Sequence, residues 1–334
     1  MMILLTGGLG FIGSHTAVTL GQTNNIIIIL DNLSNSSIET LTNIKQLVKY
    51  PENIFFIKGD VTDSNILDYI FSTYKQIESV IHFASLKSVG ESISKPLIYY
   101  KENLNGLISL LEIMNKYNCF KFIFSSSATV YGSTSQSPLK ETDTIGLNIT
   151  NPYGQTKYFQ ECILNDYSKV NSNIEITILR YFNPVGAHPS GLIGENPEGI
   201  PNNLFPYLLR VASKLYTHLN IYGNDYPTPD GTCLRDFIHV MDLAEGHVAA
   251  MMNQKKGLVI YNLGTGISTS IQQLITVFEK VNNINIPYII CPRRQGDIDI
   301  VFADVSKIFN EIGWKSTRSV EDICRDGLNY ILKL

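Results

Sequence analysis

Thr6-Gly7-Gly8-Leu9-Gly10-Phe11-Ile12-Gly13 is the stretch that decides the fold of this chain. It directly follows an apolar run, Met2–Thr6, and opens a segment with helical spacing, Phe11–Gly21. Glycines at 7, 10 and 13 permit a tight turn, close approach of the backbone to a diphosphate and close packing of helix on strand. The N-terminus of the helix favours negative charge. The stretch therefore predicts a strand, loop and helix that bind a dinucleotide.

Carboxylates after the next two expected strands fit the same ligand. Asp31 ends the second strand, where a carboxylate binds the adenosine ribose. It is followed by Asn32, and no arginine stands there to take a 2′-phosphate, which favours NAD over NADP. Asp60 and Val61 follow the third strand, from which side chains can reach the adenine; a plain turn is the alternative for Asp60.

The first half of the chain alternates apolar strands with helical segments, which predicts parallel strands joined by crossover helices. The expected strands are Met2–Thr6, Asn25–Leu30, Ile54–Ile57, Ser79–His82, Lys121–Ser125 and Glu175–Tyr181. The expected helices are Phe11–Gly21, Ile38–Tyr50, Ser64–Tyr74, Pro96–Tyr117 and Pro152–Val170. This pattern is typical of an α/β fold with a doubly wound parallel sheet.

The second half is less regular. After Asn183, frequent prolines and glycines predict short elements and long loops. One further helix, Asp242–Met252, and one strand, Gly257–Asn262, could rejoin the sheet. We expect residues 1–185, with 236–262, to form the dinucleotide-binding domain. Residues 186–235 and 263–334 should form a smaller α/β substrate domain.

Composition excludes several classes of function. Apolar residues make up 44% of the chain and charged residues 17%, with a net charge of -4, so we expect a folded globular protein without affinity for nucleic acid. The longest aliphatic run, Ile26–Leu30, is far short of the ~20 residues that cross a bilayer. The five cysteines and six histidines show no metal-binding spacing. We expect free thiols, no metal, no membrane contact and a cytoplasmic location.

A reaction centre is indicated by Tyr153-Gly154-Gln155-Thr156-Lys157, which puts a phenol and an amine about one helical turn apart. Upstream, Phe124-Ser125-Ser126-Ser127-Ala128-Thr129-Val130-Tyr131-Gly132 closes the fifth strand at the edge where such folds hold their ligands. Ser127, Tyr153 and Lys157 should meet beside the nicotinamide. Each motif alone also occurs in packing or surface positions, but the three occur here together and in order.

Tyr153 would act as the base. Lowering a phenol pKa from about 10 to about 7 takes roughly 4 kcal/mol. One ammonium about 5 Å away supplies roughly 3 kcal/mol at an effective dielectric constant of 20. We expect Lys157 and the cationic nicotinamide ring to supply it together, and Ser127 to hydrogen-bond the reacting oxygen.

These motifs resemble the extended short-chain dehydrogenases, whose NAD-binding domain is a Rossmann fold. In that superfamily, nucleotide-sugar 4,6-dehydratases and UDP-glucuronate decarboxylases carry an acidic residue shortly after the strand-end serine or threonine. Here Ala128 and Thr129 occupy those positions, so the acid for an elimination is missing.

Longer segments resemble the UDP-galactose 4-epimerase family: Phe83-Ala84-Ser85-Leu86-Lys87-Ser88-Val89-Gly90-Glu91-Ser92 and Arg180-Tyr181-Phe182-Asn183-Pro184-Val185-Gly186-Ala187-His188. The resemblance implies NAD contacts from Gly7, Gly10, Phe11, Ile12, Gly13, Asp31, Asn32, Asn35, Asp60, Val61, Phe83, Ala84, Lys87, Asn103, Ser127, Tyr153, Lys157 and Phe182. It implies UDP-sugar contacts from Lys87, Ser127, Tyr153, Phe182, Asn183, Asn202, Asn203, Leu204, Asn220, Tyr222, Arg235, Arg294, Asp297 and Val301.

The implied reaction removes and returns a hydride at C4 of the sugar, with no net oxidation. Val301 stands where narrower relatives carry a tyrosine, so UDP-GlcNAc and UDP-GalNAc are expected substrates beside UDP-glucose and UDP-galactose; a plain core role is the alternative for Val301. The resemblance also implies a homodimer formed through the helices Pro96–Tyr117 and Pro152–Val170. Two other functions stay open: an NAD(H)-sensing protein without catalysis, and a dehydrogenase that consumes free NAD.

Overall fold

The computed structural model describes residues 1–133, 136–197, 199–294 and 296–334. It contains two compact units. Unit 1 comprises Met1–Gly132, Ile145–Arg180 and Ala244–Tyr261, and unit 2 comprises Ser133–Thr144, Tyr181–Leu243 and Asn262–Leu334. The bounds differ from the expected domains mainly at Ser133–Thr144 and in the region before Ala244, both of which fall in unit 2.

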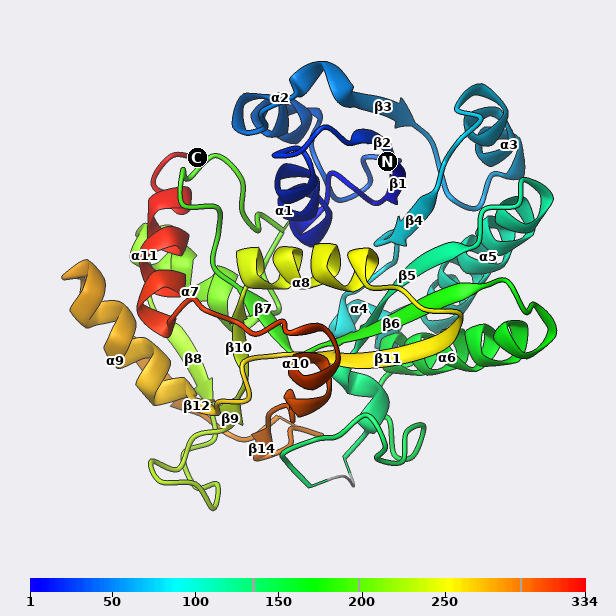
Figure 1. Ribbon diagram of the computed structural model, residues 1–334. Coiled ribbons are helices and arrows are strands. Elements are labelled where there is room, and N and C mark those ends of the chain that lie inside the picture. Colours follow the sequence, from blue (N-terminus) through cyan, green and yellow to red (C-terminus); the bar gives the residue numbers. More distant parts are fainter. Residues whose placement is uncertain (134–135, 198, 295) are drawn as a thin grey trace. The chain divides into compact units, whose positions relative to one another are not determined.

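A seven-stranded sheet forms the centre of unit 1, in the order β11-β6-β5-β4-β1-β2-β3 (Figure 1). Its strands are β1 (Met2–Thr6), β2 (Ile26–Asp31), β3 (Ile54–Lys58), β4 (Ser79–His82), β5 (Lys121–Ser127), β6 (Glu175–Tyr181) and β11 (Gly257–Leu263). β1 pairs in parallel with β2 and β4, β2 with β3, and β4 with β5. The predicted doubly wound α/β fold is confirmed.

Helices cover the sheet of unit 1. They are α1 (Phe11–Leu20), α2 (Ile38–Leu47), α3 (Ser64–Thr73), α4 (Val89–Ser94), α5 (Pro96–Lys116), α6 (Pro152–Val170) and α8 (Val240–Met252), the last of which begins in unit 2. α3, α5 and α6 lie side by side (Figure 1) and bury alternate strand residues such as Leu4, Val80 and Phe122 in one core. The alternate strand residues that point to the other face of the sheet, such as Ile3 and Ile81, are equally buried. Burial on both faces explains why the strands are almost continuously aliphatic.

α2 ends at Leu47, three residues before the expected end at Tyr50. Val48 already has extended backbone angles, and Pro51 begins a short 3-10 helix, η1 (Pro51–Asn53). A residue that precedes proline is disfavoured in the α-helical region, so Tyr50 could not continue the helix. The short helix α4 was not predicted, because its six residues carry too little periodicity.

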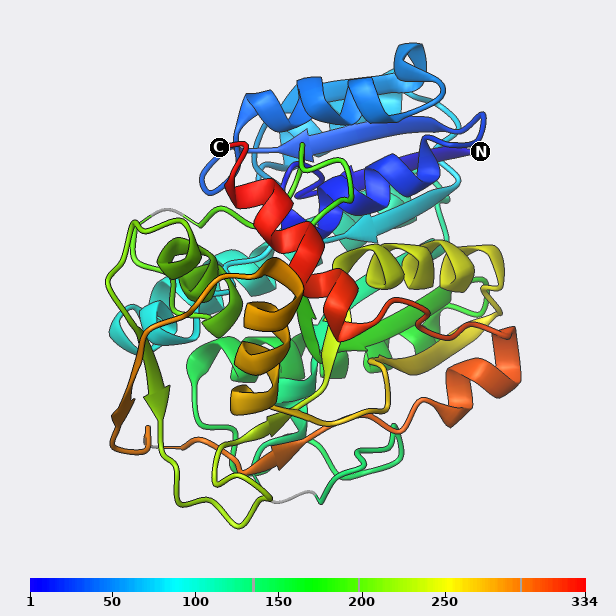
Figure 2. The same ribbon diagram turned by 90° about the vertical axis from the view of Figure 1, so that its left-hand side faces the viewer.

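Unit 2 is less regular, as expected. It holds three small sheets built from β7 (Asn183–Val185) with β10 (Phe237–His239), from β12 (Thr269–Ser270), β9 (Leu234–Arg235) and β14 (Ile300–Val301), and from β13 (Tyr288–Cys291) with β8 (Leu219–Tyr222). Its helices are α7 (Leu204–Ala212), α9 (Ile271–Asn282), α10 (Ser306–Ile312) and α11 (Val320–Ile331), in view in Figure 2. α7, α9 and α11 share a core that includes Phe205, Phe278 and Ile323. Gly327 lets α11 approach α7, because a Cβ there would lie 2.6 Å from the Phe205 ring.

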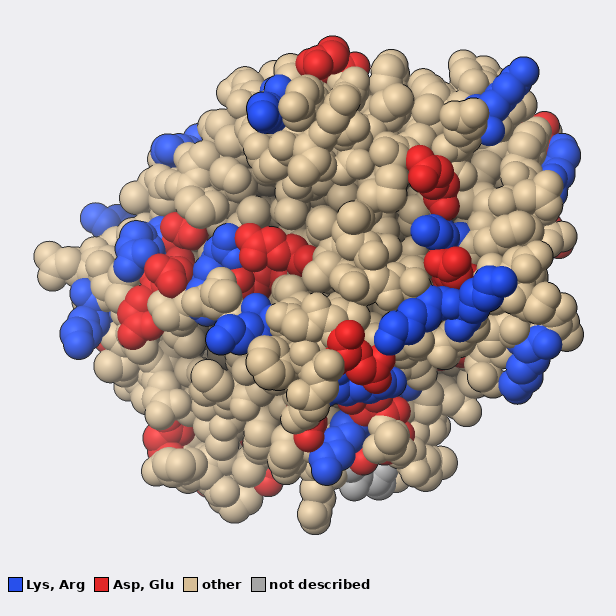
Figure 3. Space-filling view, in the orientation of Figure 1, with Lys and Arg blue, Asp and Glu red and all other residues tan. Residues whose placement is uncertain are grey.

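Surface charge is mixed. On the face shown in Figure 3, lysines and arginines are interspersed with aspartates and glutamates. No helix of the described residues combines the length and apolarity that a membrane span requires. Within the same residues, no three His, Cys, Asp or Glu side chains are grouped to hold a metal ion.

The order of the strands reverses between β1 and β4, and ligands of such sheets bind at this point, beyond the carboxyl ends of the strands. The loops that follow β1 and β4 lie against each other there, because the amides of Phe83 and Ala84 both donate to the carbonyl oxygen of Thr6. The fold thus brings two of the predicted NAD-binding segments together.

Candidate active site

The glycine-rich loop of unit 1 forms a cradle that side chains would fill. Gly7 has φ +69°, and a Cβ on it would lie 2.6 Å from the Ala84 amide nitrogen. A Cβ on Gly13 would collide with the Gly7 carbonyl oxygen. Gly10 caps α1 without a side-chain acceptor, so the first amides of this helix have no competing side-chain cap. This geometry fits the diphosphate of a dinucleotide.

Asp31 fastens this loop to the end of β2. Its carboxylate accepts hydrogen bonds from the Leu9 amide at 3.0 Å, the Leu33 amide at 3.0 Å and the Ser36 hydroxyl at 2.8 Å. The side chain is buried, at 6% exposure. Asp31 therefore stands at the predicted ribose position, with part of its hydrogen-bonding capacity used to shape the loop. Asn35 lies exposed in the same turn.

Asp60 lies beside Asn32, whose amide donates to it at 2.8 Å. Burial alone would raise the pKa of Asp60, but hydrogen bonds from Thr62 and Asn32 outweigh it and hold the pKa below its ordinary value. The Val61 side chain points into the core of unit 1, so only the backbone of Val61 is available to contact an adenine. Asn32 and Asp60 thus form a polar edge after β2 and β3.

Asn103 on α5 hydrogen-bonds the backbone of the segment that follows β4. The amide nitrogen of its side chain donates to the Leu86 carbonyl oxygen at 3.1 Å and to the Thr156 hydroxyl at 3.0 Å, and its oxygen accepts from the Leu86 amide at 2.8 Å. Asn103 therefore fixes the loop after β4, one of the predicted NAD-binding segments. Lys87 lies exposed in the loop, with its Nζ 5.8 Å from the centre of the Phe11 ring at the start of α1.

The predicted catalytic residues meet where β5 ends and α6 begins. Asn151 caps α6 through a 2.9 Å hydrogen bond from the Gly154 amide, and Pro152 occupies the first turn. Tyr153 follows, and its phenol hydrogen-bonds Ser127 at the end of β5. One turn later, Lys157 Nζ lies 6.0 Å from the centre of the Tyr153 ring. The structure therefore brings all three predicted side chains together.

The electrostatics of this centre differ from the expectation for Tyr153. Burial raises the pKa of Tyr153, and the hydrogen bond with Ser127 only partly opposes the rise. Burial also lowers the pKa of Lys157 to about 7, against the opposing charge of Glu161. Lys157 is thus only partly charged near neutral pH, and the residues of the chain alone do not produce a phenol of low pKa. A further positive charge beside the phenol, such as that of an oxidised nicotinamide, would lower the pKa of Tyr153.

Glu161 and Arg180 are residues that the sequence analysis did not single out for the site. They form a buried ion pair, with Arg180 Nη2 2.7 Å from Glu161 Oε2. Two sequence features could have pointed to the pair: Glu161 follows Lys157 by one helical turn, and Arg180 is a charge that directly follows the apolar residues Ile178 and Leu179.

Unit 2 groups part of the residues predicted for the UDP-sugar. Arg235 on β9 and Val301 on β14 are paired neighbours in one small sheet. The Arg235 guanidinium donates to the Leu234 carbonyl oxygen at 2.9 Å. Asp236 is fully buried and accepts hydrogen bonds from the Ala303 and Gly266 amides. It thereby fixes the segment that follows β14 and the segment that precedes β12.

A second group lies on the β8 and β13 sheet. The Arg294 guanidinium carbon lies 3.9 Å from the centre of the Tyr222 ring. The Asp297 amide donates to the Arg294 carbonyl oxygen at 3.3 Å. The side-chain oxygen of Asn220 is buried and has no hydrogen-bond partner among the described residues. An arginine, an aromatic ring and an unpaired amide oxygen suit a nucleotide base and its phosphates.

The remaining predicted residues of unit 2 lie at the starts of elements. Asn202 and Asn203 are exposed before α7, where Asn203 is the N-cap and Leu204 the first helical residue. Phe182 is buried, and its amide donates to the Leu263 carbonyl oxygen at 3.1 Å. Asn183 opens β7.

Comparison with known proteins assigns this arrangement to a family. Residues 4–327 match the family model described as GDP-mannose 4,6 dehydratase. A UDP-glucose 4-epimerase from Yersinia enterocolitica is 51% identical over 330 residues, covering 99% of this chain and 97% of that protein.

Solved structures agree. The structure of UDP-glucose 4-epimerase from Bifidobacterium longum in complex with NAD+ and UDP has a TM-score of 0.95 at 46% identity, covering 100% of this chain and 98% of that one. The UDP-Glc/GlcNAc 4-epimerase of Campylobacter jejuni has a TM-score of 0.86 at 32% identity, covering 100% of this chain and 99% of that one.

Proposed function

The chain belongs to the UDP-glucose 4-epimerases, and we therefore propose that it interconverts UDP-galactose and UDP-glucose with tightly bound NAD. The observation that carries the proposal is the meeting of Ser127, Tyr153 and Lys157 in unit 1, the unit that also holds the glycine cradle. A dehydratase is disfavoured, although the family model bears that description, because Ala128 and Thr129 offer no carboxyl group after the strand-end serine.

Tyr153 is the proton carrier of the proposed reaction. It takes the proton of the sugar 4-hydroxyl while the hydride leaves C4, so that a 4-keto sugar forms. Return of the hydride to the opposite face of C4, with the proton from Tyr153, gives the epimer. Bound NAD supplies the reversible hydride acceptor and a positive charge beside the phenol. Because the hydride is returned, no free NAD is consumed.

The other residues orient the reactants. Ser127 already hydrogen-bonds the Tyr153 phenol and is in place to share the proton of the 4-hydroxyl. Lys157 is anchored by a 2.8 Å hydrogen bond to the Ser125 carbonyl oxygen, and its remaining donors can hold the nicotinamide ribose. We assign NAD binding to unit 1, and nucleotide recognition to the unit 2 groups around Arg235 and Arg294.

The proposal extends to N-acetylated sugars. Val301 has a small side chain at the position where a tyrosine would narrow the sugar pocket, and it lies next to Arg235 in its sheet. A similar structure from Campylobacter jejuni is described as a UDP-Glc/GlcNAc 4-epimerase. We therefore include UDP-GlcNAc and UDP-GalNAc among the substrates.

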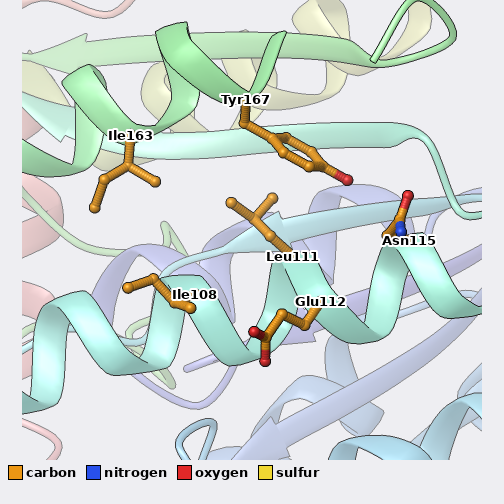
Figure 4. A pocket seen from close by; sticks show the side chains of 6 residues that line it. All are labelled: Ile108, Leu111, Glu112, Asn115, Ile163 and Tyr167. Carbon is orange, nitrogen blue, oxygen red and sulfur yellow. The ribbon is translucent and has the colours of Figure 1, made fainter. Parts of the chain in front are cut away.

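A homodimer through α5 and α6 is also part of the proposal. The two helices present a shallow, mostly apolar pocket to solvent (Figure 4), lined by Ile108, Leu111, Glu112, Asn115, Ile163 and Tyr167. Ile108 and Phe159 are each 40% exposed on this surface. Exposed apolar side chains on adjacent helices are typical of a symmetric helix-to-helix interface.

We place the protein in the cytoplasm. Its five cysteines are all free thiols, three of them buried, which suits a reducing compartment.

The first experiment incubates the purified protein with UDP-galactose and UDP-GalNAc, without added NAD, and follows C4 by NMR. Formation of both gluco-epimers supports the full proposal, and conversion of UDP-galactose alone limits it to unsubstituted hexoses. Conversion that requires stoichiometric free NAD would indicate a dehydrogenase. Binding of NAD without any conversion would indicate the sensing function.

A further inference from the structure

A buried ion pair of unit 1 includes Glu161, which follows Lys157 by one turn of α6. Arg180 and Glu161 are 1% and 3% exposed. Arg180 donates to both carboxylate oxygens of Glu161, at 3.1 and 2.7 Å, and also to the Tyr131 phenol at 3.0 Å. The Ser126 hydroxyl donates a further hydrogen bond to Glu161. The carboxylate is therefore bound by a bidentate guanidinium and a hydroxyl.

The Glu161–Arg180 pair and Lys157 both contact the carboxyl end of β5. Lys157 donates to the Ser125 carbonyl oxygen, and Glu161, one turn further along α6, accepts from the side chain of the next residue, Ser126. The residue after that is Ser127, which hydrogen-bonds the Tyr153 phenol. Two contacts from one helix thus fix the strand end from which the catalytic serine projects.

The same carboxylate also acts on the charge of Lys157. Three titratable groups interact with the lysine: Tyr153 and Glu161 on α6 and His82 on β4. Arg180 on β6 and Tyr131 on η2 (Ala128–Tyr131) lie behind Glu161, since Arg180 binds both Glu161 and Tyr131. Burial lowers the pKa of His82 to about 3, so His82 is neutral at working pH. Glu161 is the group that opposes the effect of burial on the pKa of Lys157.

We propose that Glu161, paired with Arg180, is a positioning residue that favours the protonated form of Lys157 and fixes the Ser125–Ser127 strand end. The inference rests on the proposed epimerase function for its kinetic consequence, but the protonation of Lys157 can be measured without it. A buried ion pair is weak evidence of a stabilising role, because matched apolar replacements are often neutral or stabilising. A role in the charge of the site explains the pair better.

The test compares two variants with the parent in the NAD-bound protein. Glu161→Gln keeps the shape and an acceptor but removes the charge, and Glu161→Leu/Arg180→Met removes both charges with similar volume. Glu161→Gln leaves the Arg180 charge without its counterion, so it is expected to lower the titration midpoint of Lys157 by about one pH unit, and the double variant should lower it by less. The midpoint is measured by NMR of isotope-labelled lysine, with Lys157→Met assigning the signal. The limb of the kcat profile that needs protonated Lys157 should move by about one unit in Glu161→Gln, with kcat at pH 7 falling about 5-fold and KM little changed.

Two controls separate charge from structure. Ser126→Ala removes one strand contact and keeps the carboxylate, so the midpoint should stay in place. Asp242→Asn breaks a buried aspartate–arginine pair in unit 2, where Arg318 Nη1 lies 2.6 Å from Asp242 Oδ1, and should also leave it unchanged. An unshifted Lys157 midpoint in both test variants overturns the inference. If the parent does not epimerise UDP-galactose, the proposed function fails while the NMR midpoint still decides this inference.

Discussion

Lys157 and Tyr153 stand one helical turn apart, with Nζ 6.0 Å from the centre of the phenol ring, yet burial makes each of them harder to ionise. Inside unit 1 the lysine loses part of its charge and the tyrosine keeps its proton. The chain thus prepares a reaction centre whose electrostatics are completed by the cation of the bound cofactor.

Removing the phenol tests the base. Tyr153→Phe should lower kcat for UDP-galactose by about 10²- to 10⁴-fold, because general-base catalysis contributes roughly that factor. NAD content and the affinity for UDP should stay near those of the parent. Tyr158→Phe, on the same helix and in contact with Cys162, is the matched control and should keep its activity. Equal activity of Tyr153→Phe and parent would remove Tyr153 from the mechanism.

The low pKa of Lys157 predicts a slope of stability with pH. Below about pH 7 the lysine is protonated in both the folded and the unfolded protein. Between about 7 and its ordinary value of 10.5, the unfolded chain binds a proton that the folded protein does not. The free energy of unfolding therefore rises with pH there, by up to about 1.4 kcal/mol per unit from this group.

Urea unfolding of the NAD-free protein from pH 6 to 9 measures this slope. Lys157→Met lacks the titrating group, so the difference between parent and variant isolates the contribution of Lys157. The parent should gain stability relative to the variant as the pH rises above 7. A constant difference across this range would mean that Lys157 has an ordinary pKa.

The glycine cradle predicts a loss of cofactor in Gly7→Ala. Its matched control is Gly199→Ala, because Gly199 has φ +68°, close to the +69° of Gly7, but no described atom beyond its chain neighbours lies within 4 Å of an added Cβ. Both variants carry the strain of a left-handed residue, about 1–3 kcal/mol. Only Gly7→Ala must also displace the Ala84 backbone. We expect its bound NAD, measured after denaturation, to fall at least about 10-fold, and the control to retain it.

The exposed apolar surface on α5 and α6 predicts a dimer that one charge can break. Ile108→Glu should convert the protein to monomers at micromolar concentration in light scattering, since an unpaired carboxylate would be buried in the interface. Ile267→Glu places the same charge on an exposed isoleucine of unit 2 and should not change the mass. A parent that is monomeric from the start would contradict the dimer.

The pocket size at Val301 predicts a change of specificity. Val301→Tyr should lower kcat/KM for UDP-GalNAc about 100-fold or more while activity on UDP-galactose stays within about 3-fold, because a bulky ring excludes the acetamido group. Val301→Ala enlarges the position instead and should accept both substrates. Unchanged turnover of UDP-GalNAc by Val301→Tyr would show that Val301 does not line the pocket.

Local patterns in the sequence predicted most of the fold. The aliphatic runs and the glycine spacing predicted the strands of the large sheet, with β4 and β6 correct to the residue, because burial on both faces and tight turns impose their own residue types. The end of α2 was less visible, since Pro51 acts on the backbone before it and interrupts no periodic pattern.

Resemblance named the residues of the site, but not what they do in the folded chain. Asn103 and Val61 were expected at the cofactor; in the structure the Asn103 amide holds the Leu86 backbone, and the Val61 side chain fills the core. Whether each also touches NAD stays a prediction.

The sequence by itself determined the doubly wound sheet, the dinucleotide loop and the spacing of Tyr153 and Lys157, because each depends on neighbours along the chain. Only the tertiary structure decided that Arg180 meets Glu161, and that burial lowers the pKa of Lys157 to about 7. A pKa depends on the solvent and charges around a group, and these come from strands and helices far apart in the sequence.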